Sequence, residues 1–298
     1  MQRLMDALKP HLSGRTRRRI VRSRHAVRQS TSGMRMLPDF LVIGAMRSGT
    51  SSFYKYLGYH PCIAPSLRKE TQYFSRFYDK GESWYRSHFP LAARRTTWRA
   101  LGKTLISFEA TPDYIFHPHA AQRARQLLPN ARIILLVRDP VTRAFSHYQH
   151  VTRHGWEKLD FAAALDSEER RIGEDRKRME SDPGYWGFSY HAFSYVARGL
   201  YAQQLSRWFQ EFPRERFLVL PSEHLWSDPG GFYDRVLNFL DLPSWRPRFL
   251  NYSYLDERPA VTPLDPAIRQ RLAETFRGPN KRLFAMLGTD LGWNEPGG

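Results

Sequence analysis

Residues 44–51 combine two glycines, one cation and a run of hydroxyl side chains, a composition suited to binding a phosphate-type anion. The apolar residues 40–43 precede them and predict a buried strand. Gly44 and Gly49 allow tight turns and a close approach of the backbone to a ligand, since they have no Cβ atom. A helix that begins at Thr50 would direct its free N–H groups and its dipole at the anion. The segment therefore predicts a phosphate-binding loop between a strand and a helix.

The loop lacks the lysine of nucleoside triphosphatases. Their version ends in Gly-Lys-Ser/Thr, where the lysine reaches the β- and γ-phosphates and the hydroxyl group holds Mg²⁺. Here the stretch reads Arg47-Ser48-Gly49-Thr50, so the cation precedes the glycine. We therefore expect a phosphate-type ligand without ATP hydrolysis, and we expect no bound metal.

A second basic motif, Val137-Arg138-Asp139-Pro140, follows another apolar segment and precedes Ser146. Pro140 suits the first turn of a helix, so we expect Arg138 at the carboxyl end of a strand and Ser146 about two turns into that helix. Together they could bind one phosphate through a charge-assisted bond and a hydroxyl bond. The alternative is a surface Arg–Asp pair with a helix cap, and only the neighbouring phosphate loop favours the first interpretation.

A third segment, residues 68–74, places Glu70 among cations and aromatic side chains. A carboxylate held near a cationic reaction centre stays ionised and can accept a proton from a hydroxyl group. The alternative is an ordinary salt bridge, since Glu70 is one of 29 acidic residues. The interpretation as a general base depends on the other two motifs.

The elements that must position these motifs alternate along the chain. Apolar strands separated by helices are typical of a mainly parallel sheet with helices on both faces, and ligands bind outside the carboxyl ends of such strands. We predict an α/β fold of the P-loop type in a single domain, residues 37–298. The predicted strands cover residues 39–44, 61–65, 104–109, 131–137 and 216–220. The predicted helices cover residues 50–59, 117–128, 140–154, 160–180, 191–211, 229–240 and 265–287.

Positive charge is concentrated at the N-terminus. The chain has a net charge of +17, and residues 1–36 contain ten Arg or Lys against one acid, a net of +9. We predict that residues 1–36 form a basic, flexible arm that folding does not require, and that serves either solubility or the binding of a polyanion. Nucleotide phosphates and sulfated or carboxylated glycans are the expected anionic partners, and nucleic acid is not expected.

Cysteine content and hydropathy bear on the compartment. The single cysteine, Cys62, excludes an intrachain disulfide framework and fits a reducing compartment. No stretch approaches the ~20 apolar residues of a membrane span, and the N-terminus lacks the apolar core of a secretory signal. We therefore expect a cytoplasmic protein, and a bacterial one.

Together the three motifs resemble those of the sulfotransferases that use 3′-phosphoadenosine 5′-phosphosulfate (PAPS), in particular the Golgi carbohydrate and tyrosylprotein members and their bacterial relatives. Residues 44–50 resemble the 5′-phosphosulfate loop of that family, and residues 137–146 resemble its 3′-phosphate motif. Residues 69–71 resemble the segment that supplies the catalytic base. Two further family segments are similar to residues 109–114 and 278–282, and the likeness spans residues 38–293.

The resemblance implies roles for the loop residues. Backbone amides of residues 47–51 and the hydroxyl groups of Thr50 and Ser51 would hold the 5′-phosphosulfate. Arg47 would stabilise the charge that develops on the bridging oxygen as the sulfuryl group leaves. The cofactor-binding set in this loop is Arg47, Ser48, Gly49, Thr50 and Ser51.

The resemblance also implies roles outside the loop. Glu70 would deprotonate the acceptor, while Arg138 and Ser146 would bind the 3′-phosphate. Three cations are expected where the family closes over the cofactor, although they could equally be solvated surface residues: Arg258, Lys281 and Arg282.

Two positions depart from the heparan-type 3-O members of the family. Those members usually carry Lys where this chain has Arg47, and Lys where it has Ala110. Arg at the first position is seen in other carbohydrate and tyrosylprotein members, so the substitution affects the subclass and not the activity. The missing cation at Ala110 weakens the assignment of a heparan-like acceptor.

We predict a PAPS-dependent sulfotransferase that transfers a sulfuryl group in line to an acceptor hydroxyl or amine, expected on a carbohydrate, with Glu70 as base. The candidate acceptor contacts are Glu109, His117 and Trp186, the last as part of an aromatic loop, although a structural role is the alternative for His117. Other acceptors, such as a tyrosyl peptide or a small metabolite, stay open. So does a polyanion-binding protein with a vestigial nucleotide site, whereas a nucleotide kinase would need the absent Gly-Lys-Ser/Thr.

Overall fold

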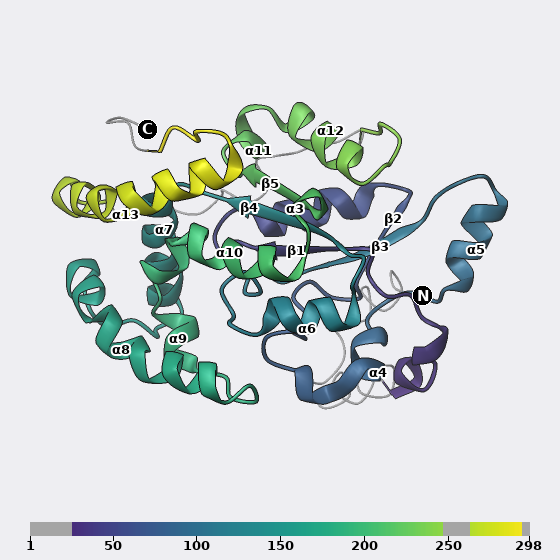
Figure 1. The fold of residues 1–298 in the computed structure, drawn as a ribbon, viewed down its shortest axis with the longest axis horizontal. Helices are drawn as coiled ribbons and strands as arrows, with labels where there is room; N and C mark the ends of the chain where they lie inside the picture. The colour runs from purple at the N-terminus through teal and green to yellow at the C-terminus, as the bar shows by residue number, and fades with distance from the viewer. Residues whose placement is uncertain (1–25, 247–262, 294–298) are drawn as a thin grey trace, which may run out of the picture.

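Five parallel strands form one sheet in the order β2-β3-β1-β4-β5 (Figure 1). The structure is a computed structural model that describes residues 26–246 and 263–293. All four pairs of neighbouring strands run parallel, which confirms the predicted α/β class. The strands are β1 (Phe40–Gly44), β2 (Ile63–Pro65), β3 (Ile106–Ala110), β4 (Arg132–Val137) and β5 (Phe217–Pro221).

Most predicted helices are present, and three short ones were not predicted: α4, α5 and α11. In the described part of the chain, no helix is both long enough and apolar enough to cross a bilayer. The helices are α3 (Thr50–Tyr59), α4 (Gly81–Arg86), α5 (Ala93–Ala100), α6 (Ala120–Leu127), α7 (Pro140–Arg153), α8 (Phe161–Ser181), α9 (Phe188–Ala192), α10 (Tyr201–Glu211), α11 (His224–Ser227), α12 (Pro229–Phe239) and α13 (Pro266–Leu287).

The sheet is buried on both faces, as its apolar strands predict. Side chains alternate along β1, so Leu41 and Ile43 join a core layer with residues of α6 and α10. Phe40 and Val42 join the opposite layer with residues of α3 and α12. Figure 1 shows these helix pairs on the two sides of the sheet. Because all five strands are parallel, their carboxyl ends lie at the same end of the sheet. The loops of the predicted site follow these ends.

The single helix predicted over residues 191–211 is wrong, because the chain breaks between α9 and α10. Glu168 on α8 is buried, and its carboxylate accepts hydrogen bonds from the backbone N–H groups of Val196 (2.7 Å) and Ala197 (2.9 Å). These N–H groups bond to a side chain instead of to carbonyls one turn earlier. Burial raises the pKa of Glu168 to about 7, although the two N–H donors partly offset this effect.

The end of the basic arm packs against the domain, so the boundary predicted at residue 36 lies too late. Arg28 donates to the carbonyl oxygens of Ser87 (2.5 Å) and Phe89 (2.7 Å) after α4. Arg35 donates to the same Phe89 oxygen (2.9 Å), and Met36 is only 3% exposed. The folded domain therefore includes this segment, whereas residues 1–25 of the arm lie outside the described residues.

Truncation tests whether the packed end of the arm, residues 26–36, stabilises the domain. A chain that starts at residue 37 loses three hydrogen bonds from Arg28 and Arg35 and should melt at least about 10 °C below a chain that starts at residue 26. Each bond from a charged donor contributes about 1.5–3 kcal/mol, and each kcal/mol shifts Tm by about 2–4 °C. Thermal unfolding followed by circular dichroism measures the difference. Gln29→Ala in the longer chain is the control, because Gln29 makes an exposed hydrogen bond. Equal melting temperatures for the two chains would mean that the segment does not stabilise the domain.

Candidate functional site

A pocket of about 860 Å³ opens at the carboxyl ends of β1, β3 and β4. Its walls come from the phosphate loop, from the segment around Glu70, from one face of α7, and from α9. The three motifs singled out in the sequence therefore meet in one cavity. This position is the one expected for a ligand of a parallel sheet.

The phosphate loop presents an open helix N-terminus to the pocket. Gly49 precedes α3 in a left-handed conformation (φ 75°) and has no side chain to cap the helix. Thr50 and Ser51 line the pocket, so the first N–H groups of α3 are available to an anion. Ser48 differs from the prediction, because its side chain is fully buried and does not line the pocket.

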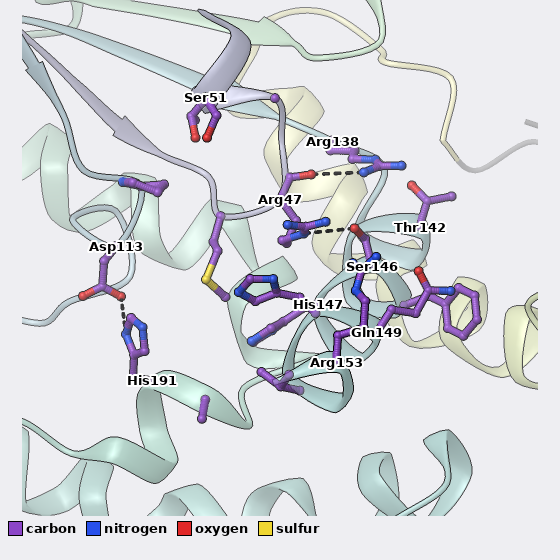
Figure 2. A pocket seen from close by; sticks show the side chains of 18 of the residues that line it. Arg47, Ser51, Asp113, Arg138, Thr142, Ser146, His147, Gln149, Arg153 and His191 are labelled. Carbon is purple, nitrogen blue, oxygen red and sulfur yellow. Dashed lines mark hydrogen bonds and ion pairs between the residues drawn. The ribbon is translucent and has the colours of Figure 1, made fainter. Parts of the chain in front are cut away.

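Two arginines and a serine converge beside this loop. Arg47 Nε donates to Ser146 Oγ (3.0 Å), and Arg138 Nη1 donates to the backbone oxygen of Arg47 (3.1 Å) (Figure 2). Asp139 caps α7 by accepting from the N–H groups of Val141 and Thr142, both at 3.2 Å. That cap fixes the helix start, so Arg138, directly after β4, and Ser146, on α7, face the loop.

Glu70 lines the same pocket and is partly exposed. Its carboxylate pairs with the ammonium group of Lys69, and its backbone N–H donates to the oxygen of Ala110 at the end of β3 (3.0 Å). Glu70 (φ 62°) has a left-handed backbone conformation that side chains other than glycine rarely adopt, and so do the pocket residues Arg47 (φ 71°) and Gln72 (φ 55°). Such strain concentrates at functional sites, where surrounding contacts hold it in place.

Glu109 does not reach the pocket, contrary to the prediction that it contacts the acceptor. It is fully buried and accepts hydrogen bonds from the hydroxyl groups of Tyr85 and Tyr114, both at 2.8 Å, and from Thr71 and Thr111. Burial raises the pKa of its carboxyl group, and these four donors partly offset the shift. Glu109 therefore anchors the segment that carries Glu70.

His117 and Trp186 also lie outside the large pocket. His117 is 3% exposed, its Nδ1 accepts from the backbone N–H of His119 (3.2 Å), and burial lowers its pKa to about 3. Trp186 packs on the guanidinium group of Arg76 (4.2 Å) and on the ring of His191 (5.2 Å). Both predicted acceptor contacts are thus packed behind the pocket wall.

Two of the three predicted C-terminal cations are not at the pocket either. Lys281 and Arg282 are exposed on α13 and do not line the cavity, and Arg258 lies outside the described residues. Arg269, in the first turn of α13, and Arg153, at the end of α7, line the pocket instead. Sequence reasoning missed them because neither belongs to a recognisable motif.

A buried ion pair at the pocket wall was also missed. Asp113 Oδ1 accepts from Arg198 Nη2 (2.7 Å) and lies 3.2 Å from His191 Nδ1. Although burial raises the pKa of Asp113, His191 and Arg198 hold it well below its usual range. The only sequence signal was the position of Asp113 in the segment that follows β3, at the carboxyl edge of the sheet.

The pocket favours anions. Its lining carries five formal cations against two acids, a net of +3 (5 − 2), from the residues Arg47, Lys69, Arg138, Arg153, Arg269, Glu70 and Asp113. Within the described ranges, no three His, Cys, Asp or Glu side chains gather into a metal-binding group. The arrangement can bind a ligand with more than one anionic group and can place a carboxylate, Glu70, beside it.

Comparisons with known proteins agree with this site. Residues 37–256 match the family model described as a sulfotransferase domain. Heparan sulfate glucosamine 3-O-sulfotransferase 6 of Mus musculus is 32% identical over 89% of this chain and 76% of its own length. Membrane-associated sulfotransferase kil1 of Dictyostelium discoideum is 28% identical over 87% of this chain and 67% of its own. The crystal structure of a sulfotransferase from Alicyclobacillus acidocaldarius superposes with a TM-score of 0.64 at 30% identity, and the match covers 87% of this chain and all of that one.

The buried pair of Asp113 and Arg198 should make stability depend on pH. Asp113→Asn leaves the buried Arg198 without a counter-charge and should lower the free energy of unfolding by about 3–5 kcal/mol at pH 7. Because the folded-state pKa of Asp113 is depressed, the unfolded chain binds more protons than the folded one below about pH 4. The wild-type advantage is therefore fully present above that pH and shrinks as the pH falls.

Urea unfolding at pH 7, 5, 4 and 3 measures this difference between wild type and Asp113→Asn. Asp79→Asn is the control, since Asp79 is 69% exposed and should change little at any pH. A wild-type advantage that stays constant down to pH 3 would contradict the assignment of Asp113 as a depressed carboxylate.

Proposed function

The chain belongs to the sulfotransferase family and is a sulfotransferase, and from this premise we propose that PAPS is its sulfuryl donor and a carbohydrate its acceptor. The family supports the donor, because its members with the three motifs use PAPS. The acceptor is supported by the relatives named as heparan sulfate glucosamine 3-O-sulfotransferases. Because the family consists of enzymes, the alternative of a polyanion-binding protein with a vestigial nucleotide site has no support.

One observation carries the proposal: an uncapped helix N-terminus lies beside Arg138 and Ser146 in the pocket, so two neighbouring positions suit anions. The uncapped N-terminus of α3 suits the 5′-phosphosulfate. Arg138 and Ser146 lie next to it, linked through Arg47, and suit a second phosphate. A donor with phosphate groups on both the 3′ and the 5′ oxygen matches this pair, whereas an adenine nucleotide without the 3′-phosphate would leave one position unused.

The proposed transfer needs one base and one site of charge stabilisation. The acceptor oxygen attacks sulfur and forms the new O–S bond, while the bond from sulfur to the bridging phosphate oxygen breaks and adenosine 3′,5′-bisphosphate (PAP) leaves. Glu70 takes the proton of the acceptor hydroxyl group. Arg47 stabilises the charge that develops on the leaving oxygen. Both residues line the same pocket, so one bound donor can contact Arg47 while its sulfuryl group faces an acceptor beside Glu70.

The backbone conformations support these roles. Arg47 and Glu70 both adopt left-handed φ values that cost energy in the folded chain, and the contacts around them keep that geometry. A rigid arrangement of base and cation reduces the reorganisation needed during transfer.

The cellular location is a separate question. That the protein is cytoplasmic and bacterial stays a prediction from its sequence.

The two anion positions predict a preference for PAP over ADP. PAP should raise the melting temperature through binding linkage, and ADP should raise it much less at the same concentration. Arg138→Gln should reduce the shift caused by PAP, because the second phosphate loses its cation. Arg132→Gln is the matched control, since Arg132 begins the same strand at the opposite edge of the sheet. Equal shifts by PAP and ADP in the wild type would show that Arg138 and Ser146 do not bind a 3′-phosphate.

Replacement of the base should remove turnover and spare donor binding. Glu70→Gln keeps the size of the side chain but cannot accept the proton, so turnover should fall about 10²–10⁴-fold with PAP affinity nearly unchanged. Arg47→Ala should lose both turnover and affinity, because Arg47 contacts the donor throughout. Radiolabelled PAPS measures transfer, and calorimetry measures PAP binding. Glu82→Gln on the exposed side of α4 is the control. Near-normal turnover of Glu70→Gln at saturating acceptor would place the base elsewhere in the pocket.

A further inference from the structure

His191 lies in the pocket wall, and neither the sequence motifs nor the proposed mechanism gives it a role. It belongs to α9, its side chain is 23% exposed, and it lines the same cavity as Glu70. Its Nδ1 lies 3.2 Å from Asp113 Oδ1 (Figure 2). Trp186 packs on the ring at 5.2 Å, so both the carboxylate and the indole restrict the orientation of the imidazole.

The partners of Nδ1 determine which ring nitrogen carries hydrogen. The ionised carboxylate of Asp113 can only accept, and the guanidinium group of Arg198, 3.3 Å from Nδ1, can only donate. One hydrogen of Arg198 Nη2 goes to Asp113 (2.7 Å), and the other can go to the backbone oxygen of His191 (3.3 Å). An unprotonated Nδ1 would place its lone pair against Asp113 Oδ1 at 3.2 Å, so the favoured tautomer has Nδ1–H donating to that carboxylate. In the neutral imidazole this leaves the lone pair on Nε2, for which no protein partner is found among the described residues.

The base and this histidine both contact the segment that follows β3. The N–H group of Glu70 donates to Ala110 (3.0 Å), and the N–H group of Gln72 donates to Thr111 Oγ1 (3.3 Å). Asp113 follows Thr111 by two residues and holds His191. The segment that carries Glu70 is therefore bonded to the same turn after β3 that holds His191, and both residues line one pocket. Figure 2 shows Asp113 and His191 apart from Arg138 and Ser146, where the proposed donor binds.

We propose that His191 Nε2 accepts a hydrogen bond from a second hydroxyl group of the acceptor, next to the hydroxyl group whose proton Glu70 takes. The inference rests on the proposed function and adds a specificity residue to it. A hydrogen bond to His191 Nε2 would favour acceptors with two neighbouring hydroxyl groups, as on a sugar ring, over acceptors with a single hydroxyl group. Asp113 acts through His191 as a positioning residue.

Replacement of His191 by Asn or by Gln can distinguish the role of Nδ1 from the role of Nε2. Asn is short and places its amide near the position of Nδ1, so His191→Asn keeps a donor for Asp113 but has no acceptor at Nε2. Gln is one carbon longer, and His191→Gln places an amide oxygen near Nε2 without the bond to Asp113. A purely structural role predicts that Asn substitutes better, whereas recognition of the acceptor predicts that Gln does.

The experiment measures PAPS-dependent transfer to a heparan sulfate hexasaccharide and to 2-naphthol, which has one hydroxyl group. His191→Asn should raise the KM for the hexasaccharide about 3- to 10-fold, the effect of one neutral hydrogen bond, with kcat nearly unchanged. His191→Gln should stay closer to wild type. Neither variant should change the KM for 2-naphthol or PAP affinity. His191→Asn should also keep the wild-type Tm, whereas His191→Gln loses the bond to Asp113 and should lower Tm slightly. His224→Asn, at an exposed position on α11, is the matched control.

Each contrary result has a distinct meaning. Wild-type KM for the hexasaccharide in His191→Asn, or an equal increase for 2-naphthol, would overturn the role of Nε2. A fall in Tm and PAP affinity in both variants would show that His191 is structural, which also overturns it. A wild-type enzyme that sulfates only 2-naphthol would remove the carbohydrate acceptor and this inference with it. A wild-type enzyme that binds PAP but sulfates neither acceptor would count against the proposed acceptor class, and the role of His191 would fall with it.

Discussion

The site depends on one buried carboxylate, Glu109, at the end of β3. A fully buried carboxylate is costly unless hydrogen bonds replace its hydration, and here the donors are hydroxyl groups from separate segments: Thr71 beside the base, Thr111 in the turn after the strand, Tyr85 on α4, and Tyr114. Each donor must come to the same point in the fold. The hydrogen bonding of one buried carboxyl group therefore fixes the segment that carries Glu70 relative to the end of the sheet where the phosphate loop begins.

This fixed frame explains how the pocket tolerates strained backbone. Arg47, Glu70 and Gln72 all have positive φ values, each of which costs about 1–3 kcal/mol for a residue other than glycine. The strain persists because neighbouring contacts leave little freedom. Thr71, between Glu70 and Gln72, bonds to Glu109, and the carbonyl oxygen of Arg47 accepts from Arg138. The residues proposed to take part in transfer are therefore held in conformations that they would not adopt alone.

The features predicted correctly from the sequence are those that adjacent residues determine. The predictions failed where contacts between residues far apart in the chain determine the structure. An apolar strand, a glycine and a helix start are adjacent in the chain, so the phosphate loop and the Arg138 motif could be recognised and the parallel sheet inferred. The contact between Asp113 and His191 joins residues 78 positions apart, and no local signal reports it. The break between α9 and α10 depends on Glu168, and the packed end of the arm depends on the carbonyl oxygen of Phe89, two more long-range contacts. Glu109 shows the same limit, since its position suggested an acceptor contact although its donors bury it.

The attraction of the pocket for anions has a buried component as well as an exposed one. Arg153 and Arg269 are exposed at the rim, so salt screens their charge. Arg143, on α7, is fully buried and donates to the backbone oxygen of Tyr195. Burial lowers its pKa to about 10, so the group is still charged at neutral pH, and it interacts electrostatically with Arg138. A charge in a low-dielectric interior acts with less screening than one in water. The region around Arg138 should therefore retain affinity for an anionic donor at ionic strengths that weaken the contribution of the rim.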